Sequence, residues 1–414
     1  MPIWRYDRPV GHGNGTMNKL SNGLTVGFTS AAHTLSHLVV LLYATVVLAL
    51  EREWGLSYSE LFALSIPMSV MFGAGALPAG WLADRWSAPG MIAVFYFGVG
   101  GAAILTSFAA TPLGIFVGLT LIGTFAAIYH PVGIPWLIKN AANRGRALGI
   151  NGVFGSVGTA GAAVVAVFLA EYVSWRAAFF VPGAITIAVG AAFILIWRMG
   201  LLHEAREDAR TNDAAPTHEM RRVFTILACT VLCTGLIYQI TSFALPKIFA
   251  ERLTGASVAG IGFMVTFVYA LSAVAQVIGG ELADRYPMKT VYVAVQVLQV
   301  PVIAAGMVLY HPALIGVAAV MVSLNVAGQP AENTLLARYT PSKWRARAFG
   351  AKFVLTLGVS AGGVALIPLV HRLTGTLDAL FIALGAFAAA AAAIAMLLPG
   401  ASVRSARPSA AAAE

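Results

Sequence analysis

Long apolar runs, each about as long as a helix that crosses a bilayer, recur along almost the whole of this 414-residue chain. A transmembrane helix needs about 20 predominantly apolar residues, and the first such run extends from Leu24 to Leu50. Charged residues make up only 10% of the sequence, against about 25% in a soluble globular domain. No soluble core could bury so much apolar surface. The sequence therefore predicts an all-α membrane protein.

Charged and Gly/Pro-rich junctions divide the chain into twelve predicted transmembrane helices, arranged as two six-helix bundles. The predicted spans are 23–49, 59–83, 90–109, 112–138, 147–170, 177–198, 224–249, 258–283, 290–310, 312–336, 349–370 and 377–398. The predicted regions are an N-terminal tail (1–22), a first bundle (23–198), a linker (199–223), a second bundle (224–398) and a C-terminal tail (399–414). The first span is too long for the core of a signal peptide, so we expect it to be retained.

The basic residues are distributed unevenly across the membrane. If both termini lie on one side, 20 Lys and Arg residues fall on that side and 5 on the other. The positive-inside rule then predicts a multi-pass protein of the cell inner membrane with both termini in the cytoplasm. A nucleic-acid-binding protein would instead gather its basic residues on one face. The net charge of +9 therefore indicates membrane topology and the lipid bilayer as partner, and no nucleic acid.

The two halves of the chain repeat each other at a spacing of about 200 residues. A shift of 200 aligns 82–85 with 282–285 and 51–52 with 251–252, and a shift of 201 aligns 144–149 with 345–350. Repeats of six spans in the same direction allow a transporter to place its solute site between two rocking halves. The repeat therefore predicts alternating access.

A short motif follows the second span and is echoed after the eighth. It consists of a glycine, three residues and an Asp-Arg pair: Gly80 with Asp84 and Arg85, then Gly280 with Asp284 and Arg285. In these residues the chain resembles the major facilitator superfamily. Ser36-His37, the stretch 123–131 and Ser174-Trp175-Arg176 are similar to the fosmidomycin-resistance group of efflux carriers. The resemblance implies a monomeric secondary carrier that exports a small organic or anionic compound.

The Asp-Arg motifs are candidate gates. A carboxylate that faces a helix N-terminus meets free N–H groups and a partial positive charge. The resemblance implies that Asp84 faces the start of the eleventh span, near Lys352, and that Asp284 faces the start of the fifth, near Asn151. We predict that Asp84 pairs with Lys352 when the cytoplasmic side is closed. The alternative is that the motifs, with Arg85 and Arg285, only cap tight loops and fix the topology.

Polar side chains at membrane depth are candidates for the solute and proton pathway, because an unpartnered polar group in hydrocarbon is costly. His33 and His37 are four residues apart and share one helix face, and His130 lies deep in the fourth span. Histidine exchanges a proton in the physiological range, so protons are the predicted coupling ion. The second half offers Tyr238, Gln239, Asn325, Gln329 and Glu332.

These polar residues also have structural interpretations. The histidines could each bind a backbone carbonyl and pack helices together. Glu332 could carry a proton or bind a cation, or it could pair with Lys352 or Arg338 near the cytoplasmic mouth.

A second hypothesis within transport is an importer of copper or zinc, or of a metal chelate. The shift of 200 places the pair His33 and His37 opposite the pair Cys229 and Cys233. Imidazole and thiolate are ligands for these metals. Against this, buried cysteine is commonly a small hydrophobe.

Other classes of protein are less consistent with the sequence. It contains no Gly-x4-Gly-Lys-Ser/Thr loop for ATP and no recognisable hydrolase constellation, so no enzyme activity and no cofactor are expected. The alternative outside transport is a membrane sensor whose polar segment 199–222 binds a partner.

Overall fold

The computed structural model describes residues 15–141, 143–202, 218–340, 342–359 and 361–399. Over these residues the chain forms helices and turns and no strand, so the predicted all-α membrane fold is confirmed. Most of the linker, 203–217, on which the sensor hypothesis depends, lies outside the described residues.

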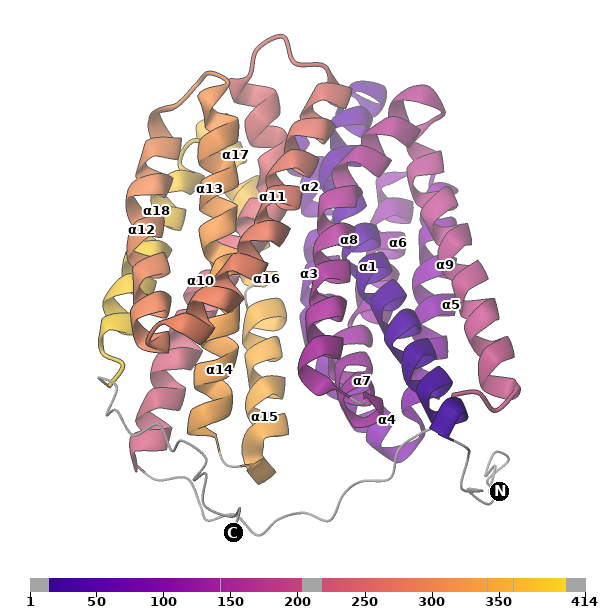
Figure 1. Cartoon of the computed structure of the whole chain (residues 1–414). Helices are drawn as coiled ribbons and strands as arrows, with labels where there is room; N and C mark the ends of the chain where they lie inside the picture. The colour runs from indigo at the N-terminus through magenta and orange to yellow at the C-terminus, as the bar shows by residue number, and fades with distance from the viewer. Residues whose placement is uncertain (1–14, 142, 203–217, 341, 360, 400–414) are drawn as a thin grey trace, which may run out of the picture.

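The helices of the first half follow the predicted spans, several of them in pieces. They are α1 (Gly15–Trp54), α2 (Tyr58–Ala63), α3 (Ile66–Ala74), α4 (Ala76–Arg85), α5 (Ala88–Ser107), α6 (Pro112–Ala126), the π-helical turn η1 (Tyr129–Gly133), α7 (Ile134–Asn140), α8 (Arg144–Tyr172) and α9 (Trp175–Arg198). Figure 1 shows these indigo-to-magenta elements gathered in one bundle.

The second half forms a second bundle beside the first (Figure 1). Its elements are α10 (His218–Arg252), α11 (Val258–Arg285), α12 (Met288–Val308), α13 (Ala313–Ala327), α14 (Gln329–Tyr339), α15 (Ser342–Phe353), the π-helical turn η2 (Val354–Val359), α16 (Ala361–Val364), α17 (Leu366–Thr374) and α18 (Leu380–Met396). Helix α10 begins at His218, within the C-terminal part of the predicted linker 199–223.

Ten helical segments of the described chain are long and apolar enough to cross a membrane. They coincide with the first ten predicted spans. The eleventh predicted span is occupied by the broken series α15, η2, α16 and α17, and the twelfth by the shorter apolar helix α18. The first turn of α1 and the last turn of α18 lie at the same end of the molecule, which we call the near end (Figure 1). The opposite end is the far end.

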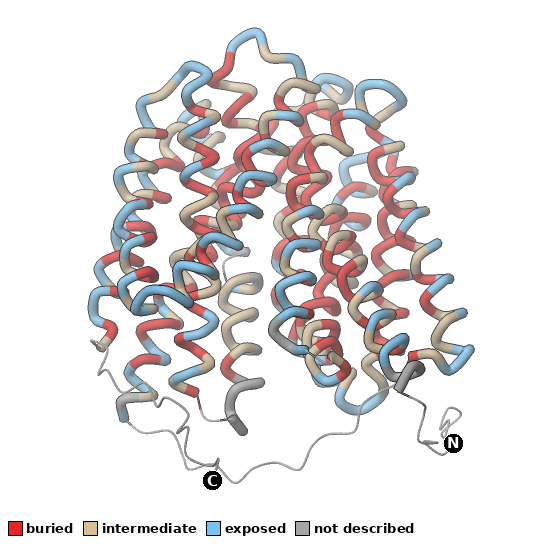
Figure 2. Tube along the Cα trace, viewed as in Figure 1, coloured by how far each residue is buried: buried red, intermediate tan, exposed pale blue. Residues whose placement is uncertain are grey.

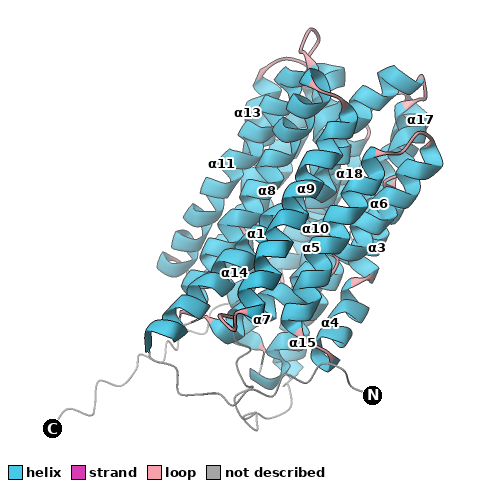
Figure 3. Cartoon of the chain, turned by 90° about the vertical axis from the view of Figure 1, so that its right-hand side faces the viewer, coloured by secondary structure: helices cyan, strands magenta, loops and turns pink. Residues whose placement is uncertain are grey.

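Local sequence sets the sharp turns between helices. The side chains of Ser87, Thr111, Ser174 and Ser257 each accept a hydrogen bond from a backbone N–H group in the first turn of the following helix. This satisfies a donor that the helix itself leaves free. Prolines in the first turns of α5 and α6 fit because their missing N–H would be unused there. Figure 3 shows the helices lying alongside one another and joined by short loops.

Buried residues lie where helices face one another, and exposed residues lie on the outside of both bundles (Figure 2). Many exposed side chains are large and apolar, including Phe108, Leu195, Phe263 and Val308. Such a surface is unusual for a protein in water. It matches a bundle whose outer face contacts lipid.

The internal repeat is visible in the packing. A β-carbon added to Gly80 would lie 3.5 Å from Pro131, and one added to Gly280 would lie 3.9 Å from Pro330. The motif helix of each half thus packs against the proline of a broken helix in the same half. The second contact repeats the first about 200 residues later in the chain. The sequence repeat therefore corresponds to a repeated packing contact in the structure.

Arg252 ties three segments together at the far end. Only 3% of its surface is exposed. It contacts Asp378 at 2.7 and 2.9 Å, and it donates to the carbonyls of Gly306, Met307 and Leu309 at the end of α12. Burial raises the pKa of Asp378, but hydrogen bonds from Tyr310 and Arg252 outweigh burial, so the pKa lies below its ordinary value.

Replacing Arg252 with Met should destabilise the protein by about 1–3 kcal/mol, because the partly exposed Asp378 carboxylate and three carbonyl groups lose their hydrogen-bond donor. The measurement is thermal unfolding in detergent. The matched control is Arg52→Met, since Arg52 holds the repeat-related position but is exposed. Equal losses of unfolding temperature in the two variants would contradict the role of Arg252.

Candidate functional site

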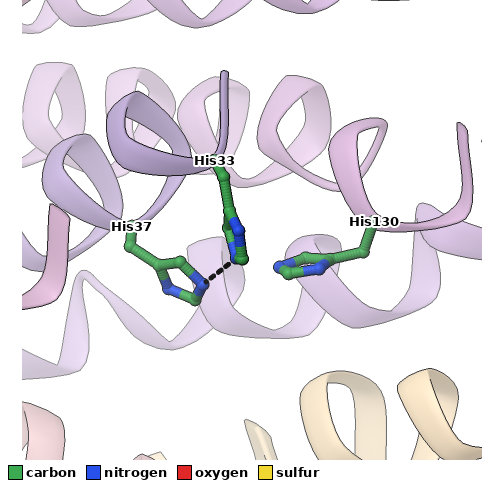
Figure 4. Close-up of side chains that lie close together, drawn as sticks. All are labelled: His33, His37 and His130. Carbon is green, nitrogen blue, oxygen red and sulfur yellow. Dashed lines mark hydrogen bonds between the residues drawn. The ribbon is translucent and has the colours of Figure 1, made fainter. Parts of the chain in front are cut away.

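Three histidines of the first half meet at membrane depth (Figure 4). His33 and His37 come from successive turns of α1, and His130 comes from η1. The Nε2 atoms of His33 and His37 are 3.2 Å apart. The His130 ring centroid lies 5.2 Å from that of His33 and 5.4 Å from that of His37. The structure therefore brings together all three histidines predicted from the sequence.

The position of His33 is fixed by α8. Its Nδ1 donates to the backbone carbonyl of Asn151 at 2.7 Å, and this makes Nε2 the free acceptor that faces His37. The same Asn151 accepts a hydrogen bond from the Tyr129 hydroxyl at 2.8 Å through its side chain, and the Tyr129 ring stacks on His33. A methyl group at Gly155 would collide with the His33 ring. Close approach of α1 and α8 is therefore a condition for this cluster.

His130 reaches toward the second half of the chain. Its ring stacks on Phe353 of α15 with centroids 5.4 Å apart, and Phe72 of α3 lies edge-on at 6.1 Å. The residue lies in a π-helical turn with Pro131, where the regular helix of the fourth span is interrupted. Such turns are often found at functional sites.

A second polar cluster, from the second half, contains Glu332 of α14 and Lys352 of α15. The Lys352 Nζ lies 2.6 Å from Glu332 Oε1, and Tyr292 of α12 donates to Glu332 Oε2 at 2.9 Å. Glu332 is 4% exposed. Lys352 also donates to the side chain of Asn333, which is exposed. The cluster is thus a buried ion pair that contacts one exposed residue, Asn333.

Glu332 and Lys352 border a small gap of about 10 Å³ between α10, α14 and α15, which is about the space of one water molecule. The other residues that line the gap are apolar: Phe224, Leu227, Ala228, Val231, Leu336, Ala348 and Leu355. An ion pair with mostly apolar surroundings is strongly held, because losing one partner leaves an uncompensated charge.

The remaining predicted pathway residues lie in two different settings. The Tyr238 hydroxyl is 3.4 Å from Thr159 of the first half, and Gln329 is 3.5 Å from Gln276 of α11, which in turn lies 3.3 Å from Ser156 of α8. The contacts of Tyr238 with Thr159 and of Gln276 with Ser156 cross between the halves, whereas the contact of Gln329 with Gln276 lies within the second half. Asn325 donates to the Thr234 carbonyl within the second half, and Gln239 is buried.

The cysteines do not join the histidines. Cys229 is exposed and Cys233 is partly buried. Among the described residues, the group of metal-ligating side chains that lies close enough to share one ion contains His33, His37 and His130. In this structure the histidine that joins His33 and His37 is His130, which is distant in sequence but lies beside α1.

At the near end the predicted gate residues are exposed. Asp84, Arg85, Asp284 and Arg285 are all exposed; Arg85 lies over the Trp81 ring, and Arg285 pairs with Glu281. Lys352 contacts Glu332 instead of Asp84. The ribbons of the two bundles spread apart toward this end (Figure 1). The pair of Asp84 with Lys352 stays a prediction for the state that is closed there.

At the far end the two halves are held together by charged and aromatic side chains. Lys247 of α10 lies 2.9 Å from Glu51 of α1 and 4.6 Å from the ring centroid of Tyr58. The Tyr58 ring packs against His371 at 5.0 Å, and His371 lies 3.2 Å from Glu251. Sequence reasoning missed this group, although a lysine in an otherwise apolar span was a signal for it.

The sequence model of the family described as Major Facilitator Superfamily matches residues 29–246 and 227–414. One curated relative is the puromycin resistance protein pur8 of Streptomyces alboniger, 30% identical over 37% of this chain. Another is the probable sulfoacetate transporter SauU of Cupriavidus necator, 22% identical over 58% of this chain. The chain covers 32% and 60% of their own lengths, less than two thirds in each case.

Solved transporter structures share the fold. A bacterial homolog of the human lysosomal transporter Spinster, inward-facing and occupied, superposes with a TM-score of 0.71 at 15% identity, over 91% of this chain and 97% of that one. A D-xylose-proton symporter gives a TM-score of 0.71 at 13% identity, over 92% of this chain and 98% of that one.

Replacing Lys247 with Met should open the far end. A charge-assisted contact of this kind contributes about 1.5–3 kcal/mol, so its loss should shift the ratio of closed to open states about tenfold or more. Spin labels at the exposed residues Val173 and Thr254, in a variant with both cysteines replaced by Ser, measure the separation of the halves. Arg176→Met is the control, because Arg176 pairs with Glu53 within the first half. Identical distance distributions in the two variants would show that the contact of Lys247 with Glu51 does not hold the far end closed.

Proposed function

Because this chain belongs to the major facilitator superfamily and is a secondary carrier of small solutes, we propose that it moves a small organic anion together with a proton. The observation that carries the proposal is the buried pair of Glu332 and Lys352. The carrier works by alternating access in the inner membrane, with both termini in the cytoplasm, as the distribution of basic residues predicts.

The ion pair supplies both binding functions. Lys352 is the cation to which a carboxylate or sulfonate group binds, and Glu332 is its resident anion. A solute anion that takes the place of Glu332 leaves that carboxylate buried without a counter-charge. An isolated buried charge is so unfavourable that the group takes up a proton instead. One anion and one proton then enter the site together, and its net charge is unchanged.

The surrounding residues fit this exchange. Tyr292 contacts both Glu332 and Thr230, so its hydroxyl can turn from one oxygen to the other as Glu332 changes charge. The exposed neighbour Asn333 gives solute and water an approach to Lys352. We therefore assign the coupling proton to Glu332, while the histidines predicted for this role form a separate cluster in the other half.

Solute binding at Lys352 can affect the contact between the two halves. Phe353 follows Lys352 directly and stacks on His130 of the first half. A movement of Lys352 toward a solute also moves the residue beside it. Occupancy of the second half is thereby coupled to a contact between the bundles, as rocking of two repeats around a shared site requires.

The names of two relatives are compatible with this proposal. Sulfoacetate, the solute in one name, is a small organic anion. Resistance, in the other name, fits the export predicted from the sequence. In a carrier that moves anion and proton together, export proceeds when the outward gradient of the solute exceeds the inward gradient of protons.

The test is flux in proteoliposomes that carry a pH-sensitive dye. A thermal-shift screen of small sulfonates and carboxylates, including sulfoacetate, first selects the anion. In the wild type, a gradient of that anion should drive proton movement in the same direction. Glu332→Gln should abolish the dependence of flux on pH, because the side chain is fixed in a neutral form. Vesicles loaded with the anion then test the export direction.

Lys352→Gln should weaken anion binding at least about tenfold, since a charge-assisted hydrogen bond is lost. The matched control is Arg285→Gln, which breaks the exposed pair of Arg285 with Glu281 in the same half and should leave binding unchanged. Proton movement in Glu332→Gln equal to that in the wild type, or selection of organic cations by the screen, would overturn the proposal.

A further inference from the structure

We propose that His33, His37 and His130 form a binding site for one divalent transition metal ion of the zinc class. The site lies in the first half of the chain and uses none of the residues assigned above to the anion and the proton. Zinc, cobalt and copper ions accept imidazole nitrogen readily. Calcium and magnesium ions require oxygen ligands and do not fit this set.

The spacing of the rings suits a metal ion. One nitrogen from each of the three rings lies within 4.8 Å of the other two. The Nε2 atoms of His33 and His37 are 3.2 Å apart, close to the edge of about 3.3 Å that follows for a tetrahedron with zinc–nitrogen bonds of about 2.0–2.1 Å. Rotation of the His130 ring toward this edge completes three ligands (Figure 4).

The ring of His33 is oriented by a hydrogen bond of the kind that orients metal-binding histidines. A ligating histidine usually donates its second N–H to a carbonyl or carboxylate, and this fixes the ring orientation and leaves the other nitrogen free for the metal. His33 does so through Nδ1 and the Asn151 carbonyl. Gly155 leaves no room for the ring to turn away. The Nε2 atom of His33 therefore faces the centre of the cluster, where it contacts Nε2 of His37 in this structure.

The ring nitrogens of His130 are the feature of the cluster that indicates a ligand. The residue is only 5% exposed, and neither of its ring nitrogens has a hydrogen-bond partner. A buried polar group without a partner is uncommon and requires an explanation, such as an ion. A metal ion between the three rings would satisfy one nitrogen of His130.

The aromatic rings that pack against the cluster, those of Tyr129, Phe72 and Phe353, are neutral. Three neutral imidazoles leave the ion with its full charge, so the fourth position belongs to water or a small anion. Three protein ligands and one exchangeable position are the pattern of open zinc sites. Because His130 stacks on Phe353, an occupied site would also fix one contact between the two halves.

The first experiment adds Co²⁺ to untagged protein in lipid nanodiscs. We expect one ion per chain and the visible absorption of tetrahedral Co²⁺, with Zn²⁺ displacing it. His37→Gln and His130→Gln should each weaken Co²⁺ binding at least about tenfold. His311→Gln is the control, because His311 is exposed in the turn before α13 and should bind like the wild type.

A second variant keeps all three ligands. Gly155→Ala displaces the His33 ring, so we expect weaker Co²⁺ binding in a chain that still unfolds cooperatively. X-ray absorption of the zinc form should show three imidazole nitrogens, and accumulation of Zn²⁺ in vesicles would support the site as one for cargo. Wild-type protein that binds no Co²⁺, or binding that His130→Gln leaves unchanged, would overturn the proposal. Anion flux in the same preparation reports separately on the carrier function.

Discussion

Every backbone group in a lipid bilayer must find its hydrogen-bond partner within the protein, and this constraint governs the structure. Continuous helices meet it without help. Where a span is interrupted, the break must be surrounded by other helices, and those are the places where side-chain chemistry gathers. His130 lies in the η1 turn, Glu332 follows the break at Gly328, and Lys352 directly precedes Phe353 and η2. Both candidate sites are therefore consequences of imperfect helices in a protected setting.

The two ends of the molecule differ in a way that the carrier cycle requires. At the far end, Lys247 joins Glu51 across the halves and Tyr58 packs on His371. At the near end, Asp84 and Asp284 are exposed. A carrier can open one end only when it closes the other, so contacts such as that of Lys247 with Glu51 must be weak enough to be exchanged. A few partly exposed ion pairs satisfy this condition better than a continuous apolar interface would.

Apolar length and local spacing made much of the fold predictable. The helical spans follow from runs of apolar residues, and the shared face of His33 and His37 follows from a spacing of four residues. Three contacts were not predictable in this way: the approach of His130 to α1, the hydrogen bond from Tyr292 to Glu332, and the contacts of Gln276 with Ser156 and Gln329. Each depends on which helices are neighbours in space, and local periodicity carries no such information. The same holds for the predicted pairing of the cysteines with the histidines, because symmetry across a repeat does not establish contact.

The internal repeat explains why two different clusters exist. Asn151 and Lys352 are equivalent under the shift of 201 residues that relates the two basic loops. Asn151 orients the neutral histidine cluster through His33 and Tyr129, whereas Lys352 organises the charged cluster through Glu332. The glycine and proline contacts that hold each half are retained. Duplication thus preserved the scaffold, and divergence at one equivalent position placed neutral ligands in one half and an exchangeable ion pair in the other.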